Sequence, residues 1–475
     1  MVISPIDDGG EAPDSPVVVD WEGPQDPRNP MNWPKSKKWT NVLAISCLTL
    51  ISPFGSSMFA PSMLQALQDF HSDNVDMGNL SVSILVLGYA FGPLIHAPLS
   101  ELYGRLVLYH VNSVLFVLFN VGCALSVNLP MLIVFRLLTG IVGACPLALG
   151  PASIADMFRQ EERGRAIATW NLPILLGPTL GPLVGSYLAS AKGWRWDFWF
   201  LSIAARILVV TMLLLRESHQ ATLLGQKAAK LRKQTGNRNI STALASTKSH
   251  KATIIDALVR PTRLLFLSPV IFTLSLCAAV NYGYIYILFT TMSSTFEKKY
   301  AISSSNVGLI YLGYGLGNII GNVVLGIFSD PLLKKMAGEG EMKPEYRLPP
   351  LLPGSVLVPI GLFIYGWTLE YSIHWIVPLI GQFIVGFGAI LVFVPINTYV
   401  VDAFTNHAAS AIAATTVFRS LGGGLLPLCG DKLYQAVGDG WGNSVLAFVG
   451  IAFLPAVWLI YKYGERMRTS SKDRP

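Results

Sequence analysis

Three arginine residues, Arg136, Arg206 and Arg419, lie inside long apolar stretches of the sequence. In a lipid environment each guanidinium would cost about 2.5–3.5 kcal/mol, so it needs hydrogen-bond acceptors or water beside it. Arg136 and Arg419 could each bind an acidic group of a small molecule, or hold helices together through backbone carbonyls. Arg136 could also relay a coupled proton. For Arg206 we favour helix packing, or a charge that reaches the membrane surface.

Polar and aromatic side chains of other apolar stretches could contact an organic molecule. Tyr282 and Tyr286 are four residues apart, so they would share one face of a helix. An aromatic pair of this kind packs as readily as it binds a ligand. The candidates to line a substrate cavity are Arg136, Asn281, Tyr282, Tyr286, Tyr311, Tyr314, Gln382, Asn397 and Arg419.

Coupling to protons would require a group that titrates while facing either side of a membrane. The candidates are His96, Glu101, Asp156 and Asp402. His titrates near pH 6.5, but we favour a space-filling role for His96. No Asp or Glu lies in the middle third of any apolar stretch. The residues alone therefore do not establish proton coupling.

These side chains depend on the apolar stretches that carry them. The chain has 475 residues, of which 52% are hydrophobic and 13% charged, with a mean hydropathy of +0.49. Soluble domains carry about 25% charged residues, and about 20 apolar residues suffice to cross a bilayer as a helix. The sequence predicts an all-α membrane protein with twelve transmembrane helices. The expected spans are residues 39–60, 80–100, 106–126, 131–153, 166–189, 198–215, 264–290, 307–328, 349–369, 375–396, 408–428 and 444–461.

The same pattern divides the chain into regions. We expect a disordered N-tail (1–38), a six-helix bundle (39–215), a central loop (216–263), a second six-helix bundle (264–461) and a C-tail (462–475). Most of the 35 Lys and Arg residues fall in the tails and on the loops of one side, which predicts that both termini are cytoplasmic. Residues 223–233 of the central loop alternate leucines with basic residues, which is typical either of a short helix on the inner membrane surface or of a solvated charge run.

Composition also excludes several classes of protein. The net charge of +7 comes from the loops, with no basic stripe of the kind that binds nucleic acid. The five cysteines lie in apolar stretches without a close pair and the seven histidines are scattered, so we expect no metal, no cofactor and no enzymatic site. No phosphate-binding loop G-x-x-x-x-G-K-[ST] occurs, which excludes an ATP-driven pump within this chain.

The two halves share a local motif. Residues 97–105 follow the second span and residues 326–335 follow the eighth. In each, an acid (Glu101 or Asp330) follows a serine, and a basic residue comes four positions later. An acid at such a turn could bind helix N-terminal amides and a neighbouring base in one conformation and release them in another. We therefore expect Glu101, Gly104, Arg105 and Asp330 to act in gating.

The fifth span has its own pattern. Gly177, Gly181 and Gly185 recur every four residues and predict one smooth helix face that allows close approach of another helix. Pro178 and Pro182 permit bending of the same helix. These residues are typical of a helix that slides against a partner span during gating.

Several of these motifs resemble those of one known family. Residues 97–105 are similar to the loop signature G-x-L-a-D-r-x-G-r-k of the major facilitator superfamily, with Ala97 for the first Gly and Leu106 for the second base. Residues 136–140 resemble its R-x-x-x-G signature. Residues 177–186 resemble the antiporter signature G-x-x-x-G-P-x-x-G-G, with Ser186 for the last Gly. Further stretches at 193–199, 216–219, 260–261, 282–283, 397–402 and 440–442 resemble the fungal branch of the twelve-span drug:proton antiporters.

The resemblance covers about residues 33–468 and implies a fold and a function. The implied fold is two pseudo-symmetric six-helix bundles, with the fourth span facing a central cavity. The implied function is an efflux pump for a drug, toxin or secondary metabolite that works by alternating access with proton coupling. The alternative is an importer or facilitator of a small metabolite or polyamine. We expect a monomer in the plasma membrane, or in a vacuolar or other internal membrane, whose partners are the bilayer, a small molecule and protons.

Overall fold

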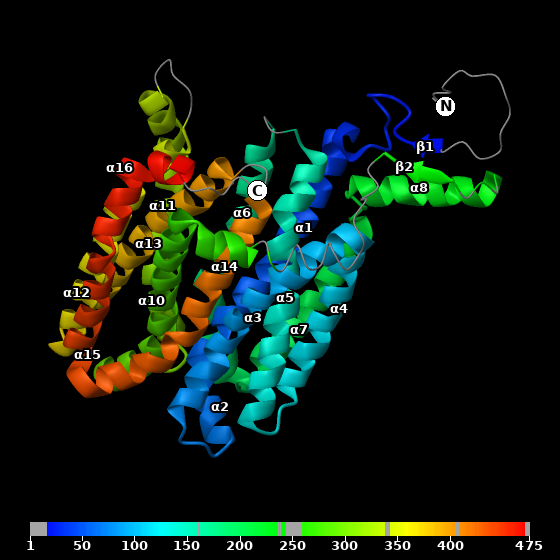
Figure 1. Ribbon diagram of the computed structural model, residues 1–475. Helices are drawn as coiled ribbons and strands as arrows, with labels where there is room; N and C mark the ends of the chain where they lie inside the picture. Colours follow the sequence, from blue (N-terminus) through cyan, green and yellow to red (C-terminus); the bar gives the residue numbers. More distant parts are fainter. Residues whose placement is uncertain are drawn as a thin grey trace, which may run out of the picture.

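Long helices that run between the same two faces make up the chain, as the computed structural model shows (Figure 1). The model describes residues 17–159, 162–235, 237, 239–243, 259, 261–337, 343–404 and 408–470. One bundle contains α1 (Lys35–Met58), α3 (Val75–Tyr103), α4 (Arg105–Ala124), α5 (Leu129–Met157), α6 (Arg163–Lys192) and α7 (Arg195–Thr211). The other contains α10 (Pro269–Tyr300), α11 (Tyr311–Ala337), α12 (Leu351–Glu370), α13 (Ile376–Ala403), α14 (Ala408–Leu425), α15 (Pro427–Ala452) and α16 (Leu454–Ser470).

Capping residues explain where several of these helices begin and end. The side chains of Asn74 and Asn128 accept hydrogen bonds from the amides of Met77 (3.1 Å) and Met131 (2.9 Å), at the starts of α3 and α5. At the end of α3, Gly104 has a φ of +91°, a left-handed conformation that favours glycine.

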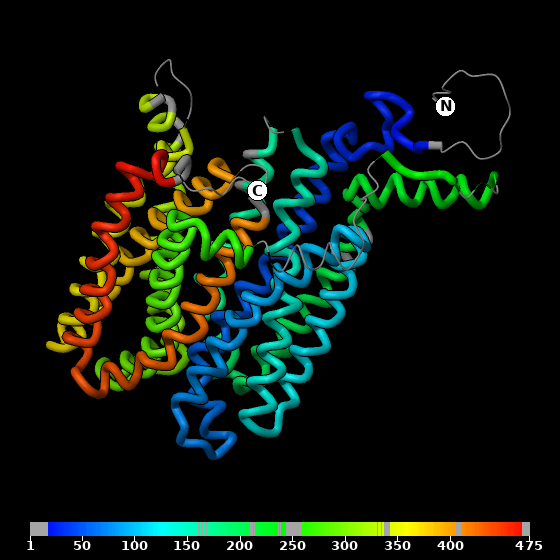
Figure 2. The backbone as a smooth tube through the Cα atoms, viewed as in Figure 1, coloured from blue at the N-terminus to red at the C-terminus, as the bar shows by residue number. Residues whose placement is uncertain are grey.

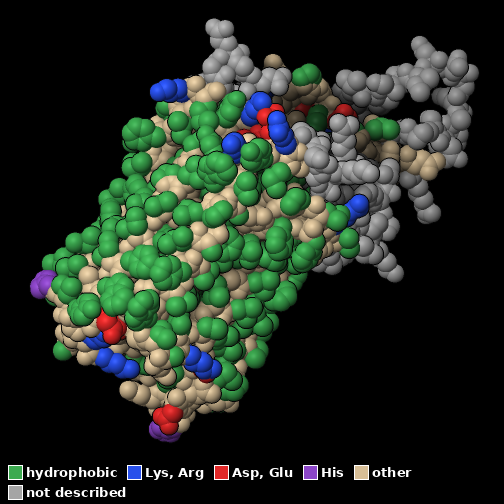
Figure 3. All heavy atoms as spheres, turned by 60° about the vertical axis from the view of Figure 1, so that its left-hand side comes forward, with side chains coloured by type: hydrophobic (Ala, Val, Ile, Leu, Met, Phe, Trp, Pro, Cys, Tyr) green, Lys and Arg blue, Asp and Glu red, His purple; other side chains and the backbone are tan. Residues whose placement is uncertain are grey.

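Length and composition confirm the membrane character. Among the described residues, ten helical stretches are long and apolar enough to cross a membrane. The other two expected spans correspond to α7, which is followed by the 3₁₀-helix η3 (Met212–Leu214), and to α14. The face that Figure 3 shows is covered with hydrophobic side chains. Ile327, Phe328 and Trp458 are exposed hydrophobic residues of the second bundle. The protein is an all-α, multi-pass membrane protein.

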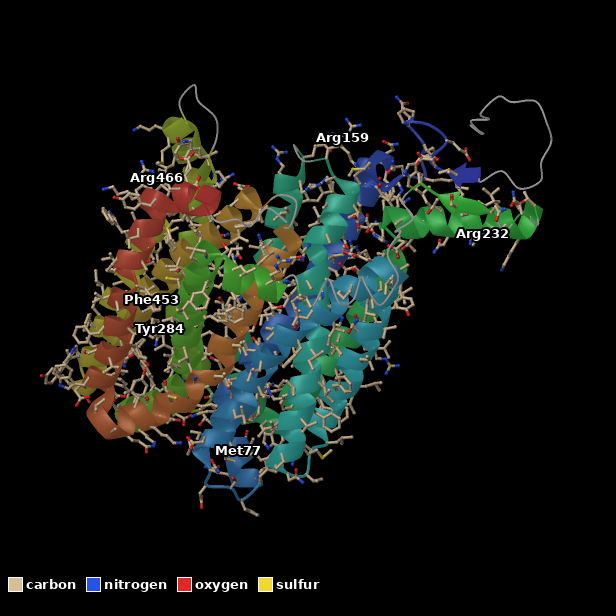
Figure 4. All side chains as sticks on the ribbon, in the orientation of Figure 1. Met77, Arg159, Arg232, Tyr284, Phe453 and Arg466 are labelled. Atoms are coloured by element: carbon tan, nitrogen blue, oxygen red, sulfur yellow. The ribbon has the colours of Figure 1, made fainter. Side chains whose placement is uncertain are left out.

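The two ends of the bundles are referred to below by their elements. The terminal face carries β1 (Val17–Val19), α8 (Gln220–Thr235) and the end of α16, and the distal face carries α2 (Met63–Asp69) (Figure 1). Figure 4 labels Arg159, Arg232 and Arg466 at the terminal face and Met77 at the distal face.

The segment between the last two expected spans is helical. We expected a loop between the spans 408–428 and 444–461, which would contain Lys432. Instead, α15 is helical from Pro427 to Ala452 except at Gly438, whose φ of +78° turns the chain sharply (Figure 2). Asp431 and Lys432 are tolerated because both bind side chains of the first bundle.

Part of the N-tail is ordered, contrary to the expectation of disorder. Val17–Val19 form β1, which pairs in parallel with β2 (Ile240–Thr242) of the central loop, and Pro30–Asn32 form the 3₁₀-helix η1. The buried side chains of Val19, Ala228 and Ile240 pack together between the strands and α8. The apolar side of residues 223–233, for which a membrane-surface helix and a solvated charge run were both considered, is therefore partly packed against the N-tail. Residues 1–16 lie outside the described part.

Each bundle has its own clusters of buried hydrophobic residues, and one further cluster contains residues of both bundles. One cluster joins Leu85, Val86 and Tyr89 of α3 and Ala144 of α5 to many residues of the second bundle, which include Tyr286. The two bundles therefore share a packed surface, where α14 lies against α3 and α6 against α11.

Candidate functional site

Hydroxyl and aromatic groups meet where the two bundles touch. The hydroxyl of Tyr286 in α10 donates to Ser56 Oγ in α1 (3.0 Å), which is a hydrogen bond from one bundle to the other. The hydroxyls of Ser52 and Tyr89 are 2.9 Å apart, within the first bundle. The ring centres of Tyr282 and Tyr286 are 5.2 Å apart, which confirms that the two share a helix face.

Arg419 joins this group from α14. Its guanidinium carbon lies 4.9 Å from the ring centre of Tyr282 and 4.7 Å from that of Phe393 in α13. Tyr282, Phe393 and Arg419 are all half-buried. Cation–π contacts with these two rings hold the guanidinium in place and still allow its N–H groups to donate to a hydrogen-bond acceptor.

The bundles are bonded together in the distal half. Lys432 of α15 forms an ion pair with Asp76 of α3 (2.8 Å). Beside it, the amide nitrogen of Asn79 donates to Asp431 Oδ2 (2.5 Å). Among the described residues, the other bonds between the bundles are Ser83 Oγ to the Gly424 carbonyl (2.9 Å), Ser186 Oγ to the Ser305 carbonyl (3.3 Å) and the Tyr286–Ser56 bond. In the described ranges, none joins the bundles in the terminal half. We call these five contacts the distal seal.

The glycine face of α6 packs inside the first bundle. A Cβ atom on Gly177 would lie 2.8 Å from the Phe54 amide nitrogen, and one on Gly181 would lie 2.7 Å from the Phe54 carbonyl oxygen. A Cβ atom on Gly185 would overlap the Met58 carbonyl. The partner of this smooth face is therefore α1.

The surface of α6 that meets the second bundle is a different one. There the glycines belong to the second bundle: Gly308 lies against Pro182 and Ser186, and Gly315 lies against Thr179. If one bundle moves against the other, this is the surface of α6 that slides.

Arg136 is buried among the helices of the first bundle. Its guanidinium donates to the backbone carbonyls of Gly55 (3.5 Å), Ser56 (3.5 Å) and Val82 (3.1 Å). It also lies over the rings of Phe59 (5.1 Å) and Phe198 (5.6 Å). Only 1% of the residue is exposed. Of the roles that we considered, this arrangement favours the structural one, in which Arg136 ties α1, α3 and α5 together.

A polar network joins helix ends at the terminal face of the first bundle. Arg105 Nε is 3.3 Å from Asp156 Oδ2, and the Arg105 guanidinium also donates to Ser100 Oγ. The amides of Arg105 and Leu106 donate to the two carboxylate oxygens of Glu217, each at 3.1 Å. Glu217 therefore caps α4, which is the role that we expected of Glu101. Glu101 itself is exposed at the end of α3.

His219 is a neighbour of this network, in the loop between η3 and α8. Its amide donates to Glu217 Oε1 (2.8 Å), and its Nδ1 lies 2.8 Å from Thr222 Oγ1. Burial and the charge of Arg105 lower the pKa of His219, while Glu217 opposes that shift. The neutral form of His219 is therefore favoured beside this network.

The second bundle repeats the arrangement with a different base. Arg347, in the 3₁₀-helix η5 (Pro344–Arg347), lies 3.1 Å from Asp402 Oδ2 and donates to Ser329 Oγ (3.4 Å). It corresponds to Arg105, with Asp402 for Asp156 and Ser329 for Ser100. We had matched Arg105 to Lys334 by spacing. Asp330 lies in α11, but its side chain and that of Lys334 lie outside the described part.

Other candidates pack within the bundles. His96 bonds to the Ile141 carbonyl (2.9 Å), which agrees with a space-filling role. The Tyr311 hydroxyl donates to the Phe289 carbonyl (2.9 Å), and Phe289 also meets Tyr314 edge-on at 5.6 Å. The remaining polar candidates, all in α10 or α13, are Asn281, bonded to the Ala389 carbonyl (3.2 Å), Asn397, bonded to the Phe393 carbonyl (3.1 Å), and the fully buried Gln382.

Sequence reasoning missed three residues that the structure brings to these sites: Glu217, Arg347 and Asp431. Glu217 belongs to a motif that we noticed, but its distance of more than 100 residues from Arg105 hid the contact. Arg347 lies outside the equal spacing that the repeat suggested. Asp431 fell beyond the expected end of its span. The one signal for Asp431 in the sequence is that an acidic residue lies close to the end of an apolar stretch.

Comparison with known proteins agrees with this geometry. The family model of the Major Facilitator Superfamily matches residues 45–427. The MFS-type transporter penM of Penicillium rubens is 50% identical over 99% of this chain and 94% of its own length. The efflux pump radE of Floropilus chiversii is 46% identical over 96% of this chain and 85% of its own length.

Solved structures share the fold at low sequence identity. A partially occluded inward-open form of the E. coli xylose transporter XylE is 17% identical, with a TM-score of 0.67 over 90% of this chain and 98% of that one. A D-xylose–proton symporter is 16% identical, with a TM-score of 0.66 over 90% and 97%. Paired bundles, repeated terminal-face ion pairs, the family model and relatives of up to 50% identity all lead to one conclusion. The chain belongs to the major facilitator superfamily of membrane transporters.

Proposed function

We propose that the protein exports an organic small molecule from the cytoplasm by alternating access. The observation that carries the proposal is the distal seal: the bonds between the bundles lie in the distal half, and the Tyr282–Arg419 group lies at the inner border of that seal. A substrate would enter from the terminal face and leave when the seal opens. The relative radE, which is named as an efflux pump, supports export.

Orientation follows from charge. We propose that the terminal face is cytoplasmic, because the basic residues Arg159, Arg232 and Arg466 lie at that face. Export out of the cell would require the plasma membrane, which we therefore propose as the location. Cysteines placed at Gln234 and Asp73, both exposed, should react with an impermeant thiol reagent from opposite sides of sealed cells. Labelling of both from outside would contradict the orientation.

For proton coupling we propose Asp431. Its carboxylate lies between the bundles, and its bond to Asn79 must break when the seal opens. Asn79 Oδ1 is buried without a hydrogen-bond partner in the described part of the chain, and a protonated Asp431 could supply that donor. Asp431→Asn should keep substrate exchange and lose export driven by a pH gradient. Unchanged gradient-driven export in this variant would refute the assignment.

Export itself can be tested in cells and vesicles. Cells that carry the gene should accumulate less of a transported compound than cells without it, and inside-out vesicles should take the compound up. An Asp76→Cys, Lys432→Cys pair tests the mechanism, because an oxidised disulfide would keep the seal closed. Transport should stop on oxidation and return on reduction, with each single variant as control. Higher accumulation in cells with the gene would show import instead.

A further inference from the structure

Arg419 is a membrane-embedded cation for which the described residues provide no acid. It contacts two aromatic rings, those of Tyr282 and Phe393, whose centres lie 4.9 and 4.7 Å from the guanidinium carbon. No Asp or Glu of the described ranges forms an ion pair with it, and its Nε is buried without a hydrogen-bond partner. Arg136, in contrast, donates to three backbone carbonyls.

The face of α14 that carries Arg419 is turned towards the boundary between the bundles. A Cβ atom on Gly423 would lie 2.6 Å from the Tyr282 ring and 3.2 Å from Val86 Cγ1 of the first bundle. Arg419 precedes Gly423 by four residues, so it shares this face one turn closer to the terminal face. Ser83 bonds to the Gly424 carbonyl on the distal side of it. Arg419 therefore lies where a molecule that enters from the terminal face would meet the seal.

An unpaired guanidinium in this place is costly, because the low dielectric of the membrane interior penalises an uncompensated charge. A bound anion would remove that penalty. The guanidinium contacts two rings and has no acid partner among the described residues, so its planar edge can form two parallel hydrogen bonds to a carboxylate. The same rings could stack on an aromatic part of the bound molecule.

Building on the proposed export function, we propose that Arg419 binds the acidic group of the substrate, and that the substrates are aromatic carboxylates. The positively charged edge of Arg419 pairs with the carboxylate, and Tyr282 and Phe393 contact the ring system. Neutral analogues of the same shape lack the ion pair and bind more weakly. Arg419 is thus the residue that selects substrates by charge.

The test measures binding to the purified full-length protein in nanodiscs by isothermal titration calorimetry. The probes are benzoate, 1-naphthoate and anthracene-9-carboxylate, each beside its uncharged carboxamide. In the wild type at least one carboxylate should bind roughly 10-fold to 100-fold more tightly than its amide, the ratio expected for a hydrogen bond to a charged group. Arg419→Gln should abolish that preference. Arg206→Gln is the matched control, because Arg206 lies within α7 but is exposed on the outside of the first bundle, and it should keep the preference.

The outcomes separate the inference from the proposed function. If no carboxylate binds the wild type more tightly than its amide, or if Arg419→Gln keeps the preference, the inference is wrong. If Arg419→Gln does not fold, Arg419→Lys is measured instead. Lysine keeps the charge but lacks the planar guanidinium, so this variant should lose most of the carboxylate affinity. Unchanged affinity would overturn the inference. A wild type that prefers carboxylates but moves nothing in vesicles would refute export alone. Equal export of acids and amides by Arg419→Gln and by the wild type would refute only the inference.

Discussion

Replacing Arg136 should reveal whether it acts as a structural tie or within the transport cycle. Arg136→Ala removes one good hydrogen bond, at 3.1 Å, and two long ones, at 3.5 Å. Polar contacts between transmembrane helices contribute about 0.6 kcal/mol on average, so we expect about 1–1.5 kcal/mol from these. The contacts with Phe59 and Phe198 add about 1 kcal/mol. Lost packing opposes the relief of a buried charge, which leaves a total of about 2–3 kcal/mol.

Arg136→Met is the informative partner of this variant. Methionine fills much of the same volume and carries no charge to desolvate, so its free energy of unfolding should lie within about 1 kcal/mol of the wild type. Unfolding of both variants by dodecyl sulfate in mild detergent micelles, followed by circular dichroism, measures the free energies. Vesicle export measures function. A stable Arg136→Met protein that cannot transport, or an Arg136→Ala protein as stable as the wild type, would refute the structural role.

Three further predictions concern the terminal face. Glu217→Gln removes the charge that caps α4, which should raise the barrier to turnover by about 1 kcal/mol and slow turnover on the order of fivefold in a counterflow assay. Glu101→Gln should change turnover little, and equal effects of the two variants would contradict the capping assignment. Exchange of Arg347 and Asp402 should restore transport that either single charge reversal loses, and no rescue in vesicle export would contradict the pair. The lowered pKa of His219 means that the folded state binds its proton less readily than the unfolded state, so the free energy of unfolding should fall as the pH drops below about 6.5; His219→Gln, unfolded at pH 7.5 and 5.5, should lack this component.

Local sequence features predicted the parts of the fold that depend on local physics. Apolar length was sufficient for the membrane helices, and the four-residue spacing of Tyr282 and Tyr286 was sufficient for their shared face. Local sequence could not distinguish a packed side chain from a partly exposed one. Tyr311 and Tyr282 are both tyrosines of apolar stretches, but Tyr311 is fully buried in its own bundle.

Contacts between distant residues account for what was missed. Glu217 and Arg105 meet across more than 100 residues, and Asn79 and Asp431 across more than 300, so no local window contains either pair. The internal repeat indicated that the terminal-face network would recur, but equal spacing pointed to Lys334. The base that pairs with Asp402 is Arg347, which lies just before the next helix, and only the three-dimensional structure identifies it.

The parallel pairing of β1 with β2 imposes an order on biosynthesis. Val17 leaves the ribosome about 220 residues before its partner Ile240, and the whole first bundle is made in between. At roughly 5–20 residues per second, the segment that becomes β1 waits on the order of 10–40 s without its partner. During that time Val17–Val19 is a short apolar strand open to pairing with other chains, a risk that its three-residue length keeps small. Once β2 has been made, its pairing with β1 joins the N-tail to the central loop. A protein fused to the N-terminus would therefore be held beside the central loop.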